Sequence, residues 1–314
     1  MPDHQSCLAA TATALTNSVR IIITNRRVFF SIFALLALPL SFLAFSLSLS
    51  SFSVKAHVLH LESLAALSST RFEARHVWKE SRESAISLLH LKLLYFPPSY
   101  LLSLLASVAS VSAAHSASSG HPASLESSLS AFKSSWYRPL LTSICIHALL
   151  FLYSCVPYTL GAAAGAGPGG SGAARLAIWA VGWGVEVYLM AVMGMGLVVS
   201  IMERSFGFGA IRVGSELMEG RRVCGWALSG LLAFLTGWIG WRMEALLRGA
   251  MDGGDVETPP KWSVEMGLAR WDWVGLVCLY GLVVVWGYVV STVFYFECRK
   301  RHVVREDDCE DDSS

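Results

Sequence analysis

The chain has 314 residues, of which 54% are hydrophobic and 15% are charged, and its mean hydropathy is +0.52. Soluble domains carry about 25% charged residues, so this composition excludes an ordinary water-soluble domain of the same length. The formal net charge of +1 also argues against a protein that holds nucleic acid on a positive surface.

Long uncharged apolar runs alternate with shorter charged stretches along the chain, as expected of helices that cross a bilayer. Such a helix needs about 20 mainly apolar residues, and six runs meet this length. They lie at about 28–52, 93–114, 139–165, 176–201, 223–241 and 274–296. Pro39 is expected to kink the first span, and Pro97 and Pro98 are expected in the first turn of the second. The predicted fold is all-α, an integral membrane bundle of six transmembrane helices.

The apolar runs divide the chain into three predicted parts. These are a cytosolic N-terminal segment at 1–27, a six-span membrane domain at 28–298, and a cytosolic tail at 299–314 that is first basic and then acidic. The acidic end of the tail is predicted to be disordered, because it consists almost entirely of charged residues. Within the membrane domain, a charged segment with its own helix is expected at 53–92, a flexible Gly-rich linker at 161–172, and a hydrophilic loop at 242–272.

Each odd-numbered span is preceded by apolar residues at helical spacing and then by arginine. The apolar residues are Leu15, Val19 and Ile22 before the first span, Leu125, Leu129, Phe132 and Trp136 before the third, and Phe206, Ala210, Val213 and Leu217 before the fifth. The basic corners that follow are Arg26 with Arg27, Arg138, and Arg221 with Arg222. An apolar stripe with a basic end is typical of an amphipathic helix lying at a membrane interface. Chance explains any single match about as well as an interfacial helix does. Three matches at equivalent places, however, favour three tandem units, each of one interfacial helix and two spans.

The orientation follows from where the basic residues lie. Six spans place both termini on one side of the membrane, and the totals of Lys and Arg on the two sides are nearly equal. Basic clusters lie directly beside the first, fifth and sixth spans on the side of the termini. The positive-inside rule depends on basic residues close to the ends of the spans. We therefore expect both termini in the cytosol, with the charged segment 53–92 as the exception to the rule.

Glu186 is the main candidate for chemistry, because an ionisable side chain inside a span is costly and by default marks a functional site. It lies near the middle of the fourth span, and its candidate partners are His147 in the third span and Tyr188. A neutral Glu186 that fixes helix packing through a hydrogen bond is the simpler interpretation. A site for an ion, a proton or a ligand is the alternative. Gly194 and Gly196 in the same span are expected at a close helix contact.

Cys298 lies at the predicted membrane edge and is a candidate for reversible palmitoylation. The seven cysteines form no CxxC pair and no zinc-site spacing, so neither a disulfide framework nor a metal site is expected. No G-x-S-x-G, phosphate-loop or H-E-x-x-H motif occurs in the sequence. An enzyme is therefore not expected, and neither is a cofactor.

Three segments carry a resemblance to known sequences: GHPASLESSLSAFKSSWYRPLLTSI, EVYLMAVMGMGLVVSIMERSFGFGAIRVGSELMEGRR and VVSTVFYFECRKRH. Through them, the stretch from His121 to His302 resembles a land-plant family of uncharacterised six-span membrane proteins. The second segment, with Ser215, Leu217, Gly220 and Arg221, is also distantly similar to the membrane domain fused to some bacterial glycerophosphodiester phosphodiesterases. There, a similar helix leads into a membrane span.

The resemblance implies the six-span architecture and a location in the endomembrane system (ER or Golgi) or the plasma membrane. It implies no activity, because the plant family has none assigned and the catalytic residues of the bacterial enzymes lie in a separate soluble domain. The first third of the chain matches less well, although Asn25-Arg26-Arg27 fits the same basic corner.

The sequence thus predicts a non-enzymatic membrane scaffold or organiser whose partners are the lipid bilayer and proteins recruited at the cytosolic ends. The alternative is a small transporter or channel that uses Glu186. Transporters usually carry several intramembrane polar groups, whereas this chain has few.

Overall fold

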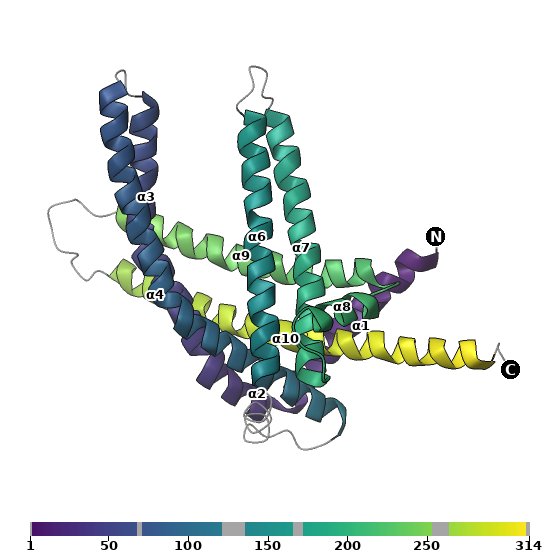
Figure 1. Ribbon diagram of the computed structural model, residues 1–314. Helices are drawn as coiled ribbons and strands as arrows, with labels where there is room; N and C mark the ends of the chain where they lie inside the picture. The colour runs from purple at the N-terminus through teal and green to yellow at the C-terminus, as the bar shows by residue number, and fades with distance from the viewer. Residues whose placement is uncertain (1, 68–70, 121–135, 166–171, 253–263, 312–314) are drawn as a thin grey trace. The chain divides into compact units, whose positions relative to one another are not determined.

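The computed structural model describes residues 2–67, 71–120, 136–165, 172–252 and 264–311, and every regular element in these ranges is helical (Figure 1). The helices are α1 (Pro2–Thr24), α2 (Arg26–Ile32), a π-helical turn η1 (Phe33–Ala37), α3 (Leu38–Leu67), α4 (Arg71–Ser118), α6 (Tyr137–Gly165), α7 (Gly172–Met202), α8 (Phe208–Leu217), α9 (Arg222–Asp252) and α10 (Val264–Asp311). The predicted all-α class is therefore confirmed for the described part of the chain.

Within the described residues, six helical stretches are long and apolar enough to cross a membrane. They are Arg26–Phe52, Lys79–Ser118, Tyr137–Gly161, Leu176–Met202, Arg222–Gly249 and Trp271–His302. Each overlaps one of the six predicted spans. The number and order of the predicted apolar helices are therefore confirmed, and they are compatible with a membrane protein.

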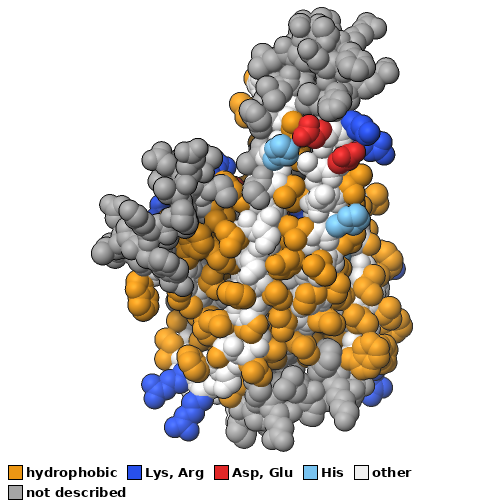
Figure 2. All heavy atoms as spheres, turned by 90° about the vertical axis from the view of Figure 1, so that its left-hand side faces the viewer, with side chains coloured by type: hydrophobic (Ala, Val, Ile, Leu, Met, Phe, Trp, Pro, Cys, Tyr) orange, Lys and Arg blue, Asp and Glu red, His pale blue; other side chains and the backbone are white. Residues whose placement is uncertain are grey.

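The surfaces of these helices carry large apolar side chains. Phe151 on α6 is 74% exposed and Trp271 on α10 is 78% exposed. Figure 2 shows one face on which hydrophobic side chains cover most of the described surface, with few charged groups among them. Exposed apolar area costs about 25 cal/mol per Å² in water, and continuous apolar patches of this kind mark contact with lipid or protein.

Several helices are longer than the sequence analysis predicted. α4 begins at Arg71, so Pro97 and Pro98 lie inside it rather than in its first turn. The predicted loop at 242–272 is mostly helical, because α9 continues to Asp252 and α10 begins at Val264. An apolar run marks only the part of a helix that suits hydrocarbon, whereas the backbone hydrogen bonds of a helix form equally well beyond it.

The C-terminal tail is a further correction. It was predicted to be disordered at its acidic end, but α10 continues through it to Asp311. Among the other segments, α3 and α4 extend into the charged segment 53–92, and α6 and α7 extend into the Gly-rich linker from both sides. Residues 166–171 of that linker lie outside the described residues.

The expected distortion at Pro39 is present as a π-helical turn. Phe33–Ala37 lies just before the proline, in the turn whose carbonyl groups face it. Proline has no backbone N–H to bond the carbonyl four residues earlier, and its ring needs room against that carbonyl. A wider turn supplies this room without ending the helix.

The described chain forms two compact units. Unit 1 comprises 1–32, 104–235 and 283–314, and unit 2 comprises 33–103 and 236–282. In unit 2, α10 packs closely on the first span, because a Cβ on Gly281 would lie 2.7 Å from Ser41 Oγ. The Phe45 and Trp273 rings meet edge to face there, 5.1 Å apart.

Unit 1 holds the main buried cluster. It includes Met195 and Val199 of α7, Ala210 of α8, Leu228 of α9 and Phe294 of α10. The helices α6 and α7 run side by side as an antiparallel hairpin (Figure 1).

The short helix α8 lies directly against α7. A Cβ on Gly214 would lie 2.8 Å from the backbone nitrogen of Gly196, and a Cβ on Gly196 would lie 2.9 Å from the Cα of Ile211. The two backbones can approach this closely only because both positions are glycine. Just before α8, the backbone N–H of Gly207 donates to the buried Thr142 Oγ1 of α6 at 2.9 Å. The predicted close contact is thus confirmed for Gly196 and wrong for Gly194, which has nothing within 4 Å.

The predicted apolar stripes of the interfacial helices agree with the observed burial only in part. At α8, Ala210 is buried and Val213 and Leu217 pack against the core cluster, so protein covers three of the four predicted stripe residues, whereas Phe206 is 52% exposed. On α1 the predicted Leu15 packs against the core cluster beside the buried Ala14, whereas the predicted Val19 is 43% exposed. Leu125, Leu129 and Phe132 lie outside the described residues. The threefold repeat therefore stays a prediction.

The contact between α7 and α8 yields a stability prediction. Gly214→Ala should lower the free energy of unfolding by about 1–3 kcal/mol, the usual cost of overpacking, because the added methyl meets the backbone of α7 rather than a side chain that can move. Gly209→Ala on the same helix is the matched control, since that position has nothing within 4 Å. Thermal unfolding in detergent, followed by tryptophan fluorescence, measures both. Equal effects of the two substitutions would contradict the close contact.

Candidate functional site

The predicted intramembrane site does not form a cluster. Glu186 is half-buried on α7, Tyr188 packs against the core cluster, and His147 is exposed on α6. The His147 ring bonds within its own helix, with Nδ1 2.8 Å from the carbonyl oxygen of Ser143. None of the hydrogen bonds and ion pairs among the described residues joins the Glu186 carboxyl to either predicted partner.

Backbone carbonyls of α7 are the acceptors near Glu186. The Tyr153 hydroxyl of α6 donates to the carbonyl of Gly182 at 2.9 Å, and the Trp226 indole N–H of α9 donates to the carbonyl of Gly184 at 3.0 Å. Glycine leaves its carbonyl open to a neighbouring helix because no side chain shields it. The pair Gly182-x-Gly184 is visible in the sequence and could have indicated these hydrogen bonds, but the predicted site named only the Glu186 carboxyl and its partners.

A polar network ties the end of α7 to α10 within unit 1. The Tyr295 hydroxyl donates to Glu203 Oε1 at 2.6 Å, and Arg299 Nη1 donates to the same oxygen at 3.2 Å. Arg299 Nη1 also donates to the Tyr295 hydroxyl oxygen at 2.6 Å. This network is not among the predicted sites, although Tyr295 and Arg299 are one helical turn apart and therefore share a face.

Arg221 differs from the other predicted basic corners. Arg26, Arg27 and Arg222 are exposed, and Arg138 lies over the Tyr137 ring, with 5.5 Å from its Cζ to the ring centroid. Arg221 instead turns toward α10, and its Nη1 lies 3.4 Å from Glu297 Oε2, with both side chains about three-quarters buried. An ion pair that is partly withdrawn from water is screened less than a surface pair.

A tight turn between α8 and α9 positions Arg221. The Arg221 N–H donates to the carbonyl of Met218 at 2.9 Å. Gly220, between them, has a φ of 82°, a conformation that favours glycine. The side chain of Met218 is fully buried and lies where a Cβ on Gly225 would overlap it. Met218 therefore anchors the turn to α9, and Gly220 lets the chain reverse so that Arg221 faces α10.

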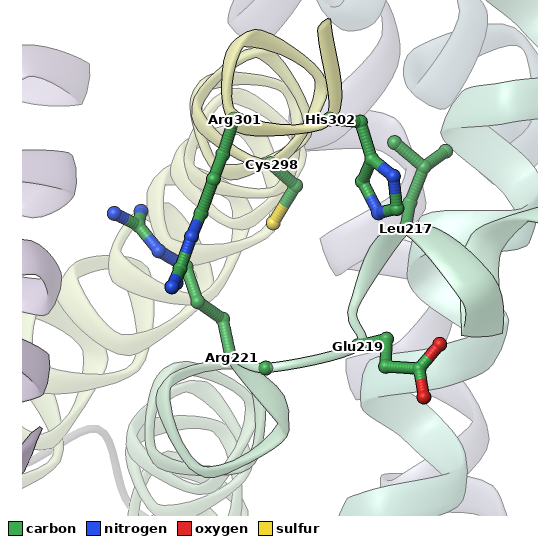
Figure 3. Close-up of a pocket in the computed structure, with 7 residues that line it drawn as sticks. Leu217, Glu219, Arg221, Cys298, Arg301 and His302 are labelled. Atoms are coloured by element: carbon green, nitrogen blue, oxygen red, sulfur yellow. The ribbon is translucent and has the colours of Figure 1, made fainter. Parts of the chain in front are cut away.

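A pocket of about 150 Å³ lies between this turn and α10. The turn contributes Leu217, Glu219, Gly220 and Arg221, and α10 contributes Cys298, Arg301 and His302. Figure 3 shows the side chains of Arg221 and Arg301 on the same side of the pocket, with the carboxyl of Glu219 pointing away from them. Two arginines line this pocket, and their charge suits an anion.

Two cysteines, Cys298 and Cys224, lie near the pocket or the start of α9. Cys298, the predicted palmitoylation site, is 2% exposed and its sulfur lines the pocket. Acylation needs an accessible thiol, so this burial disfavours the modification, which stays a prediction. Cys224, near the start of α9, is disulfide-bonded, a bond that the sequence did not predict.

The network around Glu203 yields a second prediction. Tyr295→Phe removes the hydroxyl that bonds the carboxylate and should lower the free energy of unfolding by about 1.5–3 kcal/mol, the range for hydrogen bonds to charged groups. Tyr280→Phe is the control, because its hydroxyl bonds to no described residue of the same protein. Thermal unfolding in detergent reports both changes. A Tyr295→Phe protein as stable as the control would show that the bond contributes nothing.

Comparison with known proteins gives a family but no activity. No curated protein and no solved structure matches the chain. A family model described as a domain of unknown function, DUF8558, matches residues 7–308. The match includes the first third of the chain, where the land-plant resemblance was weaker. That resemblance and the one to bacterial phosphodiesterase membrane domains stay predictions. Since the family model covers nearly the whole sequence, the chain belongs to the DUF8558 family.

Proposed function

We propose that this protein is a non-enzymatic, multi-pass integral membrane protein that organises the lipid around it and recruits protein partners at its cytosolic ends. The observation that carries the proposal is the position of α8. Its inner face is locked to α7 at Gly214, while its outer side leaves Phe208 65% exposed and the preceding Phe206 52% exposed.

Charged groups on α8 accompany these aromatic side chains. Arg212 and Glu216 are exposed and form an ion pair one turn apart, at 2.9 Å. A helix with exposed aromatic and basic groups suits the headgroup region, where aromatic rings are enriched and basic residues meet anionic lipid. This changes the predicted mechanism in one respect, because the lipid contacts would come from Phe206, the exposed first residue of the predicted stripe, and from Phe208 outside it, and not from Ala210, Val213 and Leu217.

Both ends of the chain are proposed to lie in the cytosol of an endomembrane or plasma-membrane protein, where residues 1–27 and 299–314 would bind partners. The basic residues beside the first, fifth and sixth spans support this orientation. The disulfide at Cys224 opposes it, because disulfides persist in oxidising compartments. We retain the cytosolic assignment because the basic clusters recur at three spans, whereas the disulfide is a single feature.

Reconstitution into liposomes tests the role of α8. The wild-type protein should shift the size distribution of the vesicles, and Phe206→Ser combined with Phe208→Ser should abolish most of that shift, because the exposed aromatic area is lost. Leucine at the same two positions is the matched control and should retain the effect. Cryo-electron microscopy measures the vesicle diameters. A serine variant that remodels vesicles as the wild type does would contradict the organiser role of α8.

A fluorescent dye attached to the cysteine of Phe208→Cys reports how deep α8 lies in the bilayer and on which side of the membrane. The label should be quenched by lipids that carry a quencher in the headgroup region. A water-soluble quencher that does not cross the membrane then reports which side α8 occupies relative to the termini. Quenching only from lipid-tail positions would contradict an interfacial helix.

The alternative, a small transporter or channel, rests on Glu186 alone. Glu186→Gln should leave thermal stability within about 0.5 kcal/mol of wild type, since no hydrogen bond or ion pair to a described residue is lost. It should also leave vesicle remodelling unchanged. Uptake of an ion or proton by wild-type proteoliposomes that disappears in Glu186→Gln would favour the transporter over the organiser.

A further inference from the structure

The pocket between the α8–α9 turn and α10 has a charge arrangement that the polar networks do not explain. Two arginines reach it from opposite elements of unit 1, Arg221 from the turn and Arg301 from α10 (Figure 3). Arg301 Nη1 would lie only 3.9 Å from a Cβ on Gly220. The guanidinium of Arg301 therefore lies beside the turn, although the residue as a whole is exposed.

Only one of the two guanidinium groups has a carboxylate partner among the described residues. Glu297 pairs with Arg221 through one nitrogen, which leaves the other N–H donors of that guanidinium available. Arg301 forms no ion pair with any residue that the structure describes. Glu219 lines the pocket, but it is exposed and its carboxyl points away from both arginines.

The start of α9 adds to the positive potential of the pocket. α9 begins at Arg222, directly after the turn, and the first N–H groups of a helix carry a partial positive charge. The positive charge of Arg301 and the partial positive charge of this helix end both favour an anion in the space between them. Gly220, Arg221 and Arg301 thus surround a space that suits a negatively charged group.

Phosphate fits this space better than other anions. The planar fork of arginine matches the oxygens of phosphate, and two guanidinium groups can bind different oxygens of one group. The volume of about 150 Å³ equals the room of about five water molecules, which accommodates a phosphate group with a water or two. Exposed apolar side chains follow at once on α9, with Val223 and Trp226, so the pocket lies beside an apolar surface.

We propose that the pocket formed by Gly220, Arg221, Cys298, Arg301 and His302 binds a terminal phosphate group, either of a lipid such as phosphatidic acid or of a soluble phosphate monoester. This rests on the proposed membrane location only for the lipid source. Phosphate on a lipid would enter from the headgroup layer beside Val223. Bound there, it would neutralise Arg301 and join α10 to the turn before α9.

The first experiment measures which molecules bind. The full-length protein in detergent is titrated with short-chain phosphatidic acid, with short-chain phosphatidylcholine, and with glycerol 3-phosphate as the soluble arm. Phosphatidic acid should bind at least about tenfold more tightly than phosphatidylcholine, whose phosphate is a diester masked by choline. Glycerol 3-phosphate that displaces phosphatidic acid shows that the phosphate alone is sufficient. Binding of the lipid without such displacement shows that the acyl chains are needed too.

Two substitutions in α10 localise the binding. Arg301→Gln should weaken phosphatidic acid binding by roughly tenfold, because a charge-assisted hydrogen bond to phosphate is lost. Lys300→Gln removes the same charge from the neighbouring exposed position, which does not line the pocket, and should change the affinity by less than about twofold. Arg301→Lys keeps the charge but loses the fork, and should be intermediate. Unchanged elution and unfolding profiles confirm that each variant folds.

The outcomes separate the pocket from the proposed function. Equal losses in Arg301→Gln and Lys300→Gln, or equal binding of the two lipids by the wild type, would overturn the phosphate pocket. Vesicle remodelling that persists in that case leaves the organiser role intact. Conversely, Arg301-dependent binding of phosphate without any vesicle remodelling supports the pocket and removes the organiser role.

Discussion

The close approach of α8 to α7 at Gly214 and Gly196 determines how the rest of unit 1 is arranged. Because the two backbones meet without intervening side chains, α8 has only one way to lie, with its apolar residues against the core and Phe208 outward. The turn that follows α8 then delivers Arg221 to α10. The outward aromatic groups and the pocket both depend on this one contact.

Polar side chains are used in two different ways along the helices. Within the apolar stretches, hydroxyl groups such as Ser41 and Thr292 bond to a carbonyl one turn earlier in their own helix, so they need no partner elsewhere. At the end of α7 and along the last turns of α10, in contrast, Glu203 and Arg299 bond to groups of another helix. Links between helices that involve charged groups thus lie at the ends of the apolar stretches, as expected if these stretches lie in hydrocarbon, where unpaired charges are too costly.

The organiser role and the phosphate pocket share a physical logic. In both proposals, groups fixed at one edge of unit 1 would face the headgroup layer. The aromatic side chains of α8 would supply apolar contact that does not depend on lipid charge, whereas Arg301 would respond to the charge of one headgroup. A protein built this way would respond to lipid composition through a binding event at α10, without a catalytic step or an intramembrane carboxylate.

The sequence by itself determined the all-helical class, the six apolar stretches and the distortion at Pro39, because hydrophobic length and proline chemistry are local properties. It also named Gly196, but together with Gly194, and Arg221, but as one of five basic-corner arginines. It could not assign their partners, since the contact with Gly214, the pairing of Arg221 with Glu297, and the network of Glu203 with Tyr295 join residues far apart in the chain. The helix ends were missed because hydropathy measures suitability for hydrocarbon and not helix length. Which face of α8 is buried, and whether Glu186 meets His147, were decided only by tertiary packing, which chooses among contacts that helical spacing leaves equally open.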